Sequence, residues 1–378
     1  MATSEKLKKM SAFMDKMNKT YGANTLVTGN KIKSVEFYST GNSIIDSVLG
    51  GGIAKGRMFS VYGEYSCGKT TIALQTIATN MKKDPDFTAL YLDQESALDV
   101  KYAQALGCDM DRLIVMDACE AEVGCNAIRE AIREGAFNIV VIDSTNALAP
   151  QVELGKDVAG NSSIGATAKL LSVFCRQIIG PMNKTGTSLI CIEQVRDKVG
   201  AMVMPGMPTP VTIGSGKAVG FYCSQRLELK KGKPLKEGSG DNEVQIGNTV
   251  KVKAVKNKVS KPNLKGEVVV CYGKGFDAEL ADSMFLMESG TIERVNARKY
   301  SYTDITGKVH EIVGKDNVIP YLKDNGLFQE ALDRAKGIFV NQKTTEGSES
   351  YTIEDVDGSQ KNVVIADEEV TATQALED

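Results

Sequence analysis

The stretch Gly63-Glu64-Tyr65-Ser66-Cys67-Gly68-Lys69-Thr70 has the form G-x-x-x-x-G-K-T. It follows the apolar run 59–62 and precedes the helical run 71–81, which is the strand–loop–helix context that this motif requires. Glycines let the backbone wrap phosphates, and N–H groups at a helix start supply positive potential. We therefore predict an ATP site in which Lys69 neutralises the β- and γ-phosphates and Thr70 holds Mg²⁺. The predicted phosphate-binding residues are Gly63, Ser66, Cys67, Gly68, Lys69, Thr70 and Thr71.

Two acidic residues at the ends of other apolar runs extend this prediction. Asp143 directly follows Ile139–Ile142, and we expect it to hold the Mg²⁺ through water, with a strand-end turn or helix cap as the plainer alternative. Glu95 lies just beyond the run 89–92, and strand ends in such sheets line the ligand crevice. Hydrolysis needs a group that orients the attacking water, so Glu95 is the candidate, against the alternative of a surface carboxylate.

Composition excludes several other classes of protein. The chain has 378 residues, of which 42% are hydrophobic and 25% charged, as in ordinary globular proteins. No apolar run approaches the roughly 20 residues that span a bilayer, and the start of the chain lacks a secretion signal. We therefore expect a cytoplasmic protein with no membrane partner. The eight cysteines form no C-x-x-C pair and His310 is the sole histidine, which argues against a structural zinc or a Ser-His-Asp triad.

The net charge of -3 hides an asymmetry along the chain. From Glu346 to Asp378 there are ten acidic residues and one lysine, a net of -9, so the remaining residues carry +6. A mildly basic body with an acidic tail suits a polyanion binder whose tail competes with the ligand. The alternative is a tail that only solubilises the protein. Either way, the low aromatic content of 344–378 predicts disorder.

Hydrophobic patterning predicts an α/β fold with a mostly parallel central sheet and crossover helices. From about residue 34, short β-rich runs alternate with helical stretches. The run Ile139–Ile142 is continuously apolar, as expected for a strand covered on both faces. The expected strands are Met58–Tyr62, Ala89–Leu92, Asn138–Ile142, Ser188–Ile192 and Gln225–Leu229, followed by a lysine-rich pair over Thr249–Lys258 and Gly266–Tyr272.

Four segments are expected along the chain. Residues 1–33 form an N-terminal helix, over 4–22, and a linker; such a helix must pack on its own core or on another subunit. Residues 34–275 form the ATPase core, and 344–378 the acidic tail. Between these, 276–343 is expected to be a small α/β domain. Its expected elements are helices over Ala278–Gly290 and Val318–Lys336 and a hairpin region over Arg294–Ile312.

Five blocks of sequence, in matching order and spacing, resemble the bacterial RecA recombinase family over residues 3–340. The chain looks like a diverged member, of a kind that a phage encodes. The resemblance implies a RecA-type P-loop core with an N-terminal helix and a small C-terminal domain. The five blocks are Ser39-Thr40-Gly41 with Gly50-Gly51-Gly52-Ile53; Ser66–Thr71; Asp93–Asp99 with Tyr102; Val141-Ile142-Asp143-Ser144 with Ala147-Leu148-Ala149-Pro150; and Ile192-Glu193-Gln194-Val195-Arg196 with Phe221-Tyr222 and Arg226-Leu227.

The resemblance also implies roles around the nucleotide. Glu95 would be the catalytic glutamate, and Gln194 would sense the γ-phosphate and pass that state to a DNA-binding loop. ATP would lie between subunits, with Lys256 and Lys258 reaching it from the neighbour. From the residues alone, these two lysines read equally as the charged face of an exposed strand. The residues expected to contact adenine or lie against the nucleotide are Asp99, Tyr102, Tyr272 and Gly273.

Two segments would bind DNA, by the same resemblance. One is 153–165, which leads into a helix, and the other is the Gly/Pro/Met-rich run 196–216, which has no helical or strand period. Contacts would be mainly to phosphates, so binding would tolerate many sequences and weaken with salt. The residues expected at DNA are Lys169, Ser172, Arg176, Arg196, Lys198, Val199, Gly214 and Gly216, with Lys230, Lys231, Lys251 and Lys253 holding a second duplex.

The chain departs from the family at three positions. Ser96 replaces the usual His after the catalytic Glu, and Cys67 replaces Ser in the P-loop. Gly220 stands where many members place an interface lysine, which puts the strength of DNA-stimulated hydrolysis in doubt.

The function expected from these features is an ATP-dependent DNA recombinase. It would use ATP and Mg²⁺, assemble with itself into a helical filament on single-stranded DNA, and exchange strands with homologous double-stranded DNA. Two alternatives share the P-loop core: a RecA-fold hexameric DNA motor, and a filament scaffold that protects DNA or activates a protease.

Overall fold

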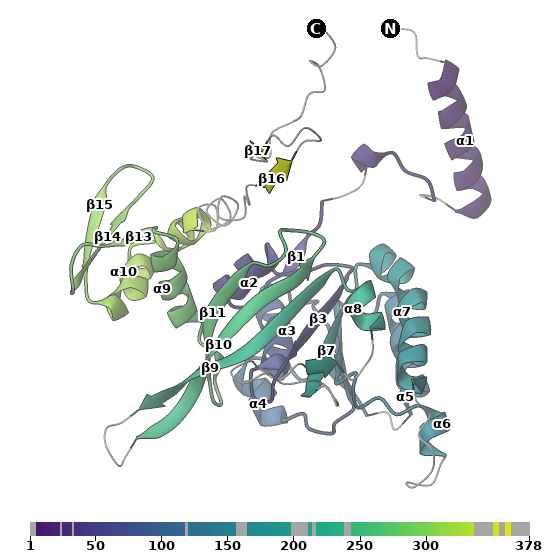
Figure 1. Cartoon of the computed structure of the whole chain (residues 1–378), viewed down its shortest axis with the longest axis horizontal. Coiled ribbons are helices and arrows are strands. Elements are labelled where there is room, and N and C mark those ends of the chain that lie inside the picture. The colour runs from purple at the N-terminus through teal and green to yellow at the C-terminus, as the bar shows by residue number, and fades with distance from the viewer. Residues whose placement is uncertain are drawn as a thin grey trace. The chain divides into compact units, whose positions relative to one another are not determined.

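The computed structural model divides the chain into two units, Met1–Glu36 and Phe37–Asp378 (Figure 1). The structure describes residues 5–22, 25–31, 34–117, 120–155, 165–197, 211–213, 217–237, 243–335, 351–354 and 360–363. No described helix combines the length and apolar character that crossing a bilayer requires.

The first unit contains the expected N-terminal helix, α1 (Glu5–Tyr21). No residue of α1 is buried, and Met10 and Phe13 are about half exposed, at 47% and 56%. Near the end of the helix, the Asn18 side chain makes two hydrogen bonds to the backbone of Leu26, at 2.7 and 3.0 Å. A short 3₁₀ turn, η1 (Gly29–Lys31), follows. The helix therefore presents its apolar stripe on a surface of its own unit.

A ten-stranded sheet forms the centre of the second unit, in the order β12-β11-β10-β9-β3-β7-β6-β4-β5, with β8 paired to β7. From β9 to β5 the neighbours run parallel, and from β9 to β12 antiparallel. The predicted fold class is confirmed, and so is each of the seven predicted strands. The strands are β3 (Met58–Gly63), β4 (Ala89–Asp93), β5 (Leu113–Met116), β6 (Ile139–Asp143), β7 (Ser188–Asp197), β8 (Val211–Ile213), β9 (Gln225–Glu237), β10 (Val244–Asn257), β11 (Lys265–Cys271) and β12 (Gly275–Phe276).

Helices cover both faces of the parallel half of this sheet. In β4, Tyr91 packs with the core on the α3 side, whereas Leu90 and Leu92 pack with α5 and α7 on the other (Figure 1). Successive side chains of a strand point to opposite faces, so strands covered on both sides read as continuous apolar runs. The helices are α2 (Ser43–Leu49), α3 (Lys69–Lys83), α4 (Val100–Ala105), α5 (Ala121–Glu134), α6 (Gln151–Leu154), α7 (Ala166–Thr185) and α8 (Ala218–Tyr222); a small separate sheet pairs β1 (Phe37–Tyr38) with β2 (Ile53–Ala54).

Two features of the core differ from the sequence expectations. The edge strand β5 was not predicted; its Ile114 and Val115 are 48% and 43% exposed, so no buried alternation marks it. The run 196–216 was expected to have no strand character, and this is wrong at its two arms. Arg196 in β7 pairs with Thr212 in β8, an antiparallel contact that a scan of local sequence does not detect. Residues 198–210 lie outside the described part of the chain.

The C-terminal region contains α9 (Ala278–Glu288), the sheet β13 (Ile292–Arg294), β14 (Lys299–Thr303) and β15 (Val309–Val313), then η3 (Lys315–Asn317) and α10 (Val318–Asp324). The single helix predicted over 318–336 is wrong. It breaks at Asn325-Gly326, where Gly326 has φ +68°, and helix resumes over 328–335. The boundary expected at 275/276 falls inside β12, whose Phe276 is buried in the core.

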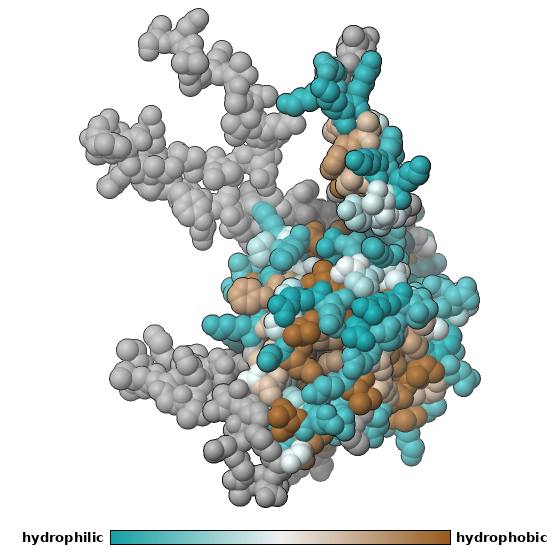
Figure 2. All heavy atoms as spheres, turned by 90° about the vertical axis from the view of Figure 1, so that its right-hand side faces the viewer, coloured by the Kyte–Doolittle hydropathy of each residue, from teal (hydrophilic) through white to brown (hydrophobic). Residues whose placement is uncertain are grey.

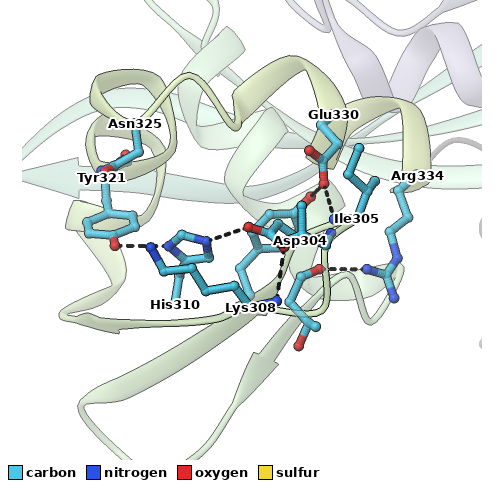
Figure 3. Close-up of polar contacts among 11 residues, drawn as sticks. Asp304, Ile305, Lys308, His310, Tyr321, Asn325, Glu330 and Arg334 are labelled. Carbon is cyan, nitrogen blue, oxygen red and sulfur yellow. Dashed lines mark hydrogen bonds and ion pairs between the residues drawn. The ribbon is translucent and has the colours of Figure 1, made fainter.

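Polar contacts tie the β14–β15 turn of this region to its helices (Figure 3). The His310 imidazole lies between Asp304 Oδ2, at 3.0 Å from Nε2, and Tyr321 OH, at 3.2 Å from Nδ1. The buried Tyr302 donates its hydroxyl proton to Glu330 Oε1 at 2.7 Å. The histidine is therefore accounted for as a structural residue of the small domain.

In the segment 344–378, the structure describes two short strands, β16 (Tyr351–Glu354) and β17 (Gln360–Val363), which pair antiparallel. These strands depart from the disorder expected there. The remaining residues of the acidic tail lie outside the described part of the chain.

Candidate nucleotide-binding and catalytic site

The P-loop joins β3 to α3, and close packing requires glycine at both of its ends. A Cβ on Gly63 would lie 2.3 Å from the carbonyl oxygen of Leu229, and one on Gly68 would lie 2.9 Å from Phe276 Cζ. Gly68 has φ +88° and precedes α3 without a side-chain cap. The N–H groups of the first helical turn are thereby left for phosphate oxygens.

Two P-loop residues singled out in the sequence, Lys69 and Cys67, have distinct environments. Lys69 Nζ donates to the carbonyl oxygens of Gly63 and Glu64, at 3.1 and 2.7 Å. Phosphate oxygens would replace these carbonyls as acceptors. Cys67 is fully buried, its Sγ donates to Glu64 O at 2.9 Å, and burial raises the pKa of the thiol. The thiol is therefore a neutral packing group in place of the usual serine.

Strand register brings the predicted metal site together. Gly63 in β3 is level with Gln194 in β7, and Asp93 in β4 is level with Asp143 in β6, so these strand ends meet at one edge. Thr70 Oγ1 donates to Asp143 Oδ2 at 2.7 Å. Burial raises the pKa of Asp143, an effect opposed by hydrogen bonds from Tyr91 and Thr70. A hydroxyl and a carboxylate in contact form an oxygen donor set that fits Mg²⁺.

Two side chains donate hydrogen bonds to the same oxygen of the Glu95 carboxylate. Ser144 Oγ donates to Glu95 Oε1, and Gln194 Nε2 donates to that atom at 2.5 Å. Asn146 fixes Gln194 in turn, accepting from its backbone N–H at 2.9 Å and donating to its carbonyl at 3.2 Å. The two predicted catalytic residues therefore touch each other. Sequence reasoning missed Ser144 and Asn146, which only the strand order places here.

A cleft of about 560 Å³ lies beside the P-loop, a size typical of ligand pockets. Tyr102 OH lies 2.9 Å from Thr71 Oγ1, and Asp99 caps α4 by accepting the N–H groups of Lys101 and Tyr102. Tyr272 OH accepts from Gln245 and Asn248 at 2.9 and 2.8 Å. The cleft brings together the four residues expected at the nucleoside with Ser66, Gly68 and Thr71; it is also lined by Lys101, Ala105, Val270 and Cys271, which the sequence did not single out.

The structure does not bring Lys256 and Lys258 to this cleft, whose lining includes neither. Lys256 Nζ instead donates to the carbonyl oxygens of Gly220 and Phe221 at the end of α8, at 2.8 Å each. Burial is the largest cause lowering the pKa of Lys256. Phe221 beside it is 72% exposed.

The departure at Gly220 has a structural reason. A Cβ there would lie 2.5 Å from Arg226 Nη1. Arg226 stacks over the Tyr62 ring, 4.7 Å from its centroid, and its Nη2 lies 3.3 Å from Oε1 of the fully buried Glu193. Ser60 also donates to Glu193. A guanidinium paired with Glu193, the residue before Gln194, therefore occupies the space that a larger side chain at 220 would need.

The residues predicted at DNA fall into three groups. Lys169 and Arg176 are exposed on α7 and Ser172 is half-buried. Lys230 in β9 lies directly opposite Lys251 in β10, with Lys253 two residues further on the same face and Lys231 on the other. The remaining predicted residues are Arg196, whose backbone lies in β7 and whose side chain is outside the described set, and Lys198, Val199, Gly214 and Gly216, which lie outside the described residues altogether.

Comparison with known proteins now bears on this site. Residues 8–277 match the family model described as the RecA N-terminal domain. Protein RecA of Staphylococcus epidermidis RP62A is 37% identical over 337 residues, covering 88% of this chain and 91% of that protein. Protein RecA of Staphylococcus aureus JH9 is also 37% identical over 337 residues, covering 88% and 92%. A crystal structure of the RadB recombinase is similar with a TM-score of 0.46 and 23% identity, over 64% of this chain and 98% of that one. The chain belongs to the RecA family of ATP-dependent recombinases, which are DNA-dependent ATPases.

Proposed function

We propose that this recombinase assembles into a filament on single-stranded DNA and exchanges that strand with homologous duplex. ATP and Mg²⁺ would lie between successive copies. The observation that carries the proposal is the contact between Glu95 and Gln194. Gln194 lies in the same strand as Val195 and Arg196, which pair with β8 at the base of the run expected to bind DNA. Glu95, which would orient the water, is therefore bonded to the strand β7, which continues into the β7–β8 strand pair expected to bind DNA.

The chain's own residues divide the chemistry of hydrolysis among them. Lys69 exchanges the carbonyls of Gly63 and Glu64 for the β- and γ-phosphates. Thr70 and Asp143 would hold Mg²⁺, which would supply positive charge beside the phosphates when bound. Glu95 orients the attacking water and accepts its proton.

Gln194 connects the nucleotide state to DNA. With the γ-phosphate present, its side-chain amide donates to the phosphate and leaves Glu95 Oε1, which frees that carboxylate for the water. Because Asn146 holds the backbone of Gln194, the side chain can turn while the strand end stays fixed. Gln194 thereby changes its hydrogen-bond partner at the base of the β7–β8 strand pair, directly before Val195 and Arg196.

Charge on two surfaces supports binding to DNA. Lys169 and Arg176 are exposed about two turns apart on α7. On the β9–β10 strand pair, Lys230 and Lys251 lie opposite each other and both are exposed, and Lys230 Nζ lies 3.5 Å from Glu228 Oε2. Exposed lysines on one face are suited to contact a phosphate backbone. We propose that α7 contacts the single strand and that the β9–β10 strand pair contacts the second duplex.

Apolar surfaces support assembly of copies. α1 exposes Met10 and Phe13, and the edge strand β5 exposes Ile114 and Val115. An exposed apolar edge is a template for a strand of another chain. Figure 2 shows further hydrophobic patches among hydrophilic side chains on the face that carries α5–α7, where Val152 is also exposed. We propose that α1 of one copy docks on the core of the next.

ATP turnover with Mg²⁺, measured with and without single-stranded DNA across a salt series, tests this function. We expect stimulation by the strand that fades as salt rises, because phosphate contacts release counterions. Hydrolysis that is indifferent to DNA at every salt concentration would contradict the coupling proposed through Gln194. Rings rather than filaments in electron micrographs would instead favour the hexameric motor.

A further inference from the structure

Tyr91 makes a polar contact at the metal site that neither the P-loop motif nor the family blocks require. Its hydroxyl donates to Asp143 Oδ2 at 2.5 Å, the same oxygen that accepts from Thr70 at 2.7 Å. Tyr91 lies in β4, two residues before Asp93, and only 1% of its surface is exposed. Both donors converge on one carboxylate oxygen from different elements, the sheet and the P-loop helix.

The two donors are not equivalent. Thr70 would also have to offer its hydroxyl oxygen to Mg²⁺, so its position depends on the metal. The Tyr91 hydroxyl is fixed instead by a ring buried in the core between β4 and α3.

Because both donors bind Oδ2, the other carboxylate oxygen of Asp143, Oδ1, is left for the metal. In the part of the chain that the structure describes, no donor contacts Oδ1 of Asp143, while Oδ2 accepts twice. A carboxylate held at one oxygen by a rigid donor cannot rotate about its Cβ–Cγ bond, which keeps the other oxygen in one place. Such outer partners orient groups that bind metals and are often worth about 10–100-fold in metal affinity.

We propose that Tyr91 is a positioning residue for magnesium, holding Asp143 so that Oδ1 faces the metal's water before Mg²⁺ arrives. This inference rests on the proposed metal role of Asp143 and Thr70. Its distinct content is that the phenolic hydroxyl, and not only the packing of the ring, sets the Mg²⁺ requirement.

The test is a Mg²⁺ titration of the full-length protein with a fluorescent ADP derivative, for wild type and Tyr91→Phe. Phenylalanine keeps the ring and removes the hydroxyl. We expect the Mg²⁺ concentration for half-maximal binding to rise about tenfold. Affinity for the nucleotide in EDTA should not change, because the hydroxyl acts only through the metal.

Tyr302→Phe is the matched control. Tyr302 is also fully buried and also donates to a carboxylate, Glu330, but it lies in the C-terminal region. Both variants should lose some stability in urea with EDTA, and only Tyr91→Phe should shift the Mg²⁺ titration. A shift of equal size in Tyr302→Phe would overturn the inference, since general loosening would then explain it.

Asp143→Asn separates this inference from the proposed function. If Asp143→Asn raises the Mg²⁺ concentration for half-maximal binding and Tyr91→Phe does not, the positioning role is wrong and the metal site stands. Tighter Mg²⁺ binding in Tyr91→Phe would also overturn it, because the hydroxyl would then be competing with the metal. An unchanged titration in Asp143→Asn would contradict the metal site itself, and the inference with it.

Discussion

The phosphate end of the nucleotide site and the lysines of β10 differ in how complete they are within one chain. At the phosphate end, Thr70, Asp143 and Glu95 already make hydrogen bonds to neighbouring side chains of the site. On β10, Lys256 is bonded instead to the backbone of α8 and lies outside the nucleotide cleft. The phosphate end is organised within one chain, whereas the charge of Lys256 is held at the carbonyl oxygens of α8.

This difference indicates where control lies. A site that is fully formed in one chain would hydrolyse ATP continuously, whereas one that needs a lysine from the next copy hydrolyses only when copies assemble. The contact of Lys256 with the α8 carbonyls links that lysine to the helix that follows the ribbon expected to bind DNA. We expect assembly and DNA binding both to act on the contact between Lys256 and α8.

The largest effect should come from removing the charge at the phosphate end. We expect Lys69→Ala to lower ATP hydrolysis on the order of 10³-fold and to abolish strand exchange, since Lys69 is the P-loop residue proposed to neutralise the β- and γ-phosphates. Steady-state phosphate release measures this. Lys82→Ala, an exposed position in the last turn of the same helix, is the control and should behave as wild type. Normal turnover in Lys69→Ala would refute the site assignment.

A smaller, conditional effect is expected on β10. Lys256→Ala should leave ADP binding by dilute protein unchanged and reduce DNA-stimulated hydrolysis on the order of 10²-fold, because its charge acts only across an interface. Lys265→Ala, exposed on the adjacent strand β11, is the matched control. Weaker ADP binding by Lys256→Ala before assembly would place the lysine in its own chain's site and remove the contrast between the two halves.

The smallest effect is expected at Gly220, whose carbonyl oxygen accepts a hydrogen bond from Lys256. Gly220→Ala would place a Cβ 2.5 Å from Arg226 Nη1, so the guanidinium must move away from Glu193. We expect a loss of about 1–2 kcal/mol in the free energy of unfolding, the typical cost of disturbing a charged hydrogen bond. Urea unfolding measures it. An unchanged midpoint would show that Arg226 shifts without cost.

The parts of the site that one local motif carries could be predicted from the sequence. The P-loop, the carboxylates after two apolar runs and the strands of the parallel sheet all depend on short-range pattern. The edge strand β5 was not predicted because its residues are half exposed. The arms of the 196–216 run were not predicted because their antiparallel pairing joins residues that are about 16 positions apart in sequence. The helix break at Asn325-Gly326 was readable, since this dipeptide favours a turn.

The supporting contacts of the site could not be read in this way. Tyr91 and Asp143 are far apart in sequence, as are Glu193 and Arg226, and only the strand order β9-β3-β7-β6-β4 makes them neighbours. A tyrosine in an apolar strand is normally a core residue, and this one is buried as such. Its second role depends on where the hydroxyl ends, which register and packing decide together.

Mixing two inactive variants tests the division of the site between copies most directly. Glu95→Gln lacks the water-orienting carboxylate and Lys256→Ala lacks the reaching lysine, so each alone should hydrolyse little ATP. In an equal mixture on single-stranded DNA, head-to-tail assembly would join intact Glu95 to intact Lys256 at some interfaces, restoring roughly a quarter of wild-type turnover. A mixture no more active than either variant would contradict a site shared between neighbours.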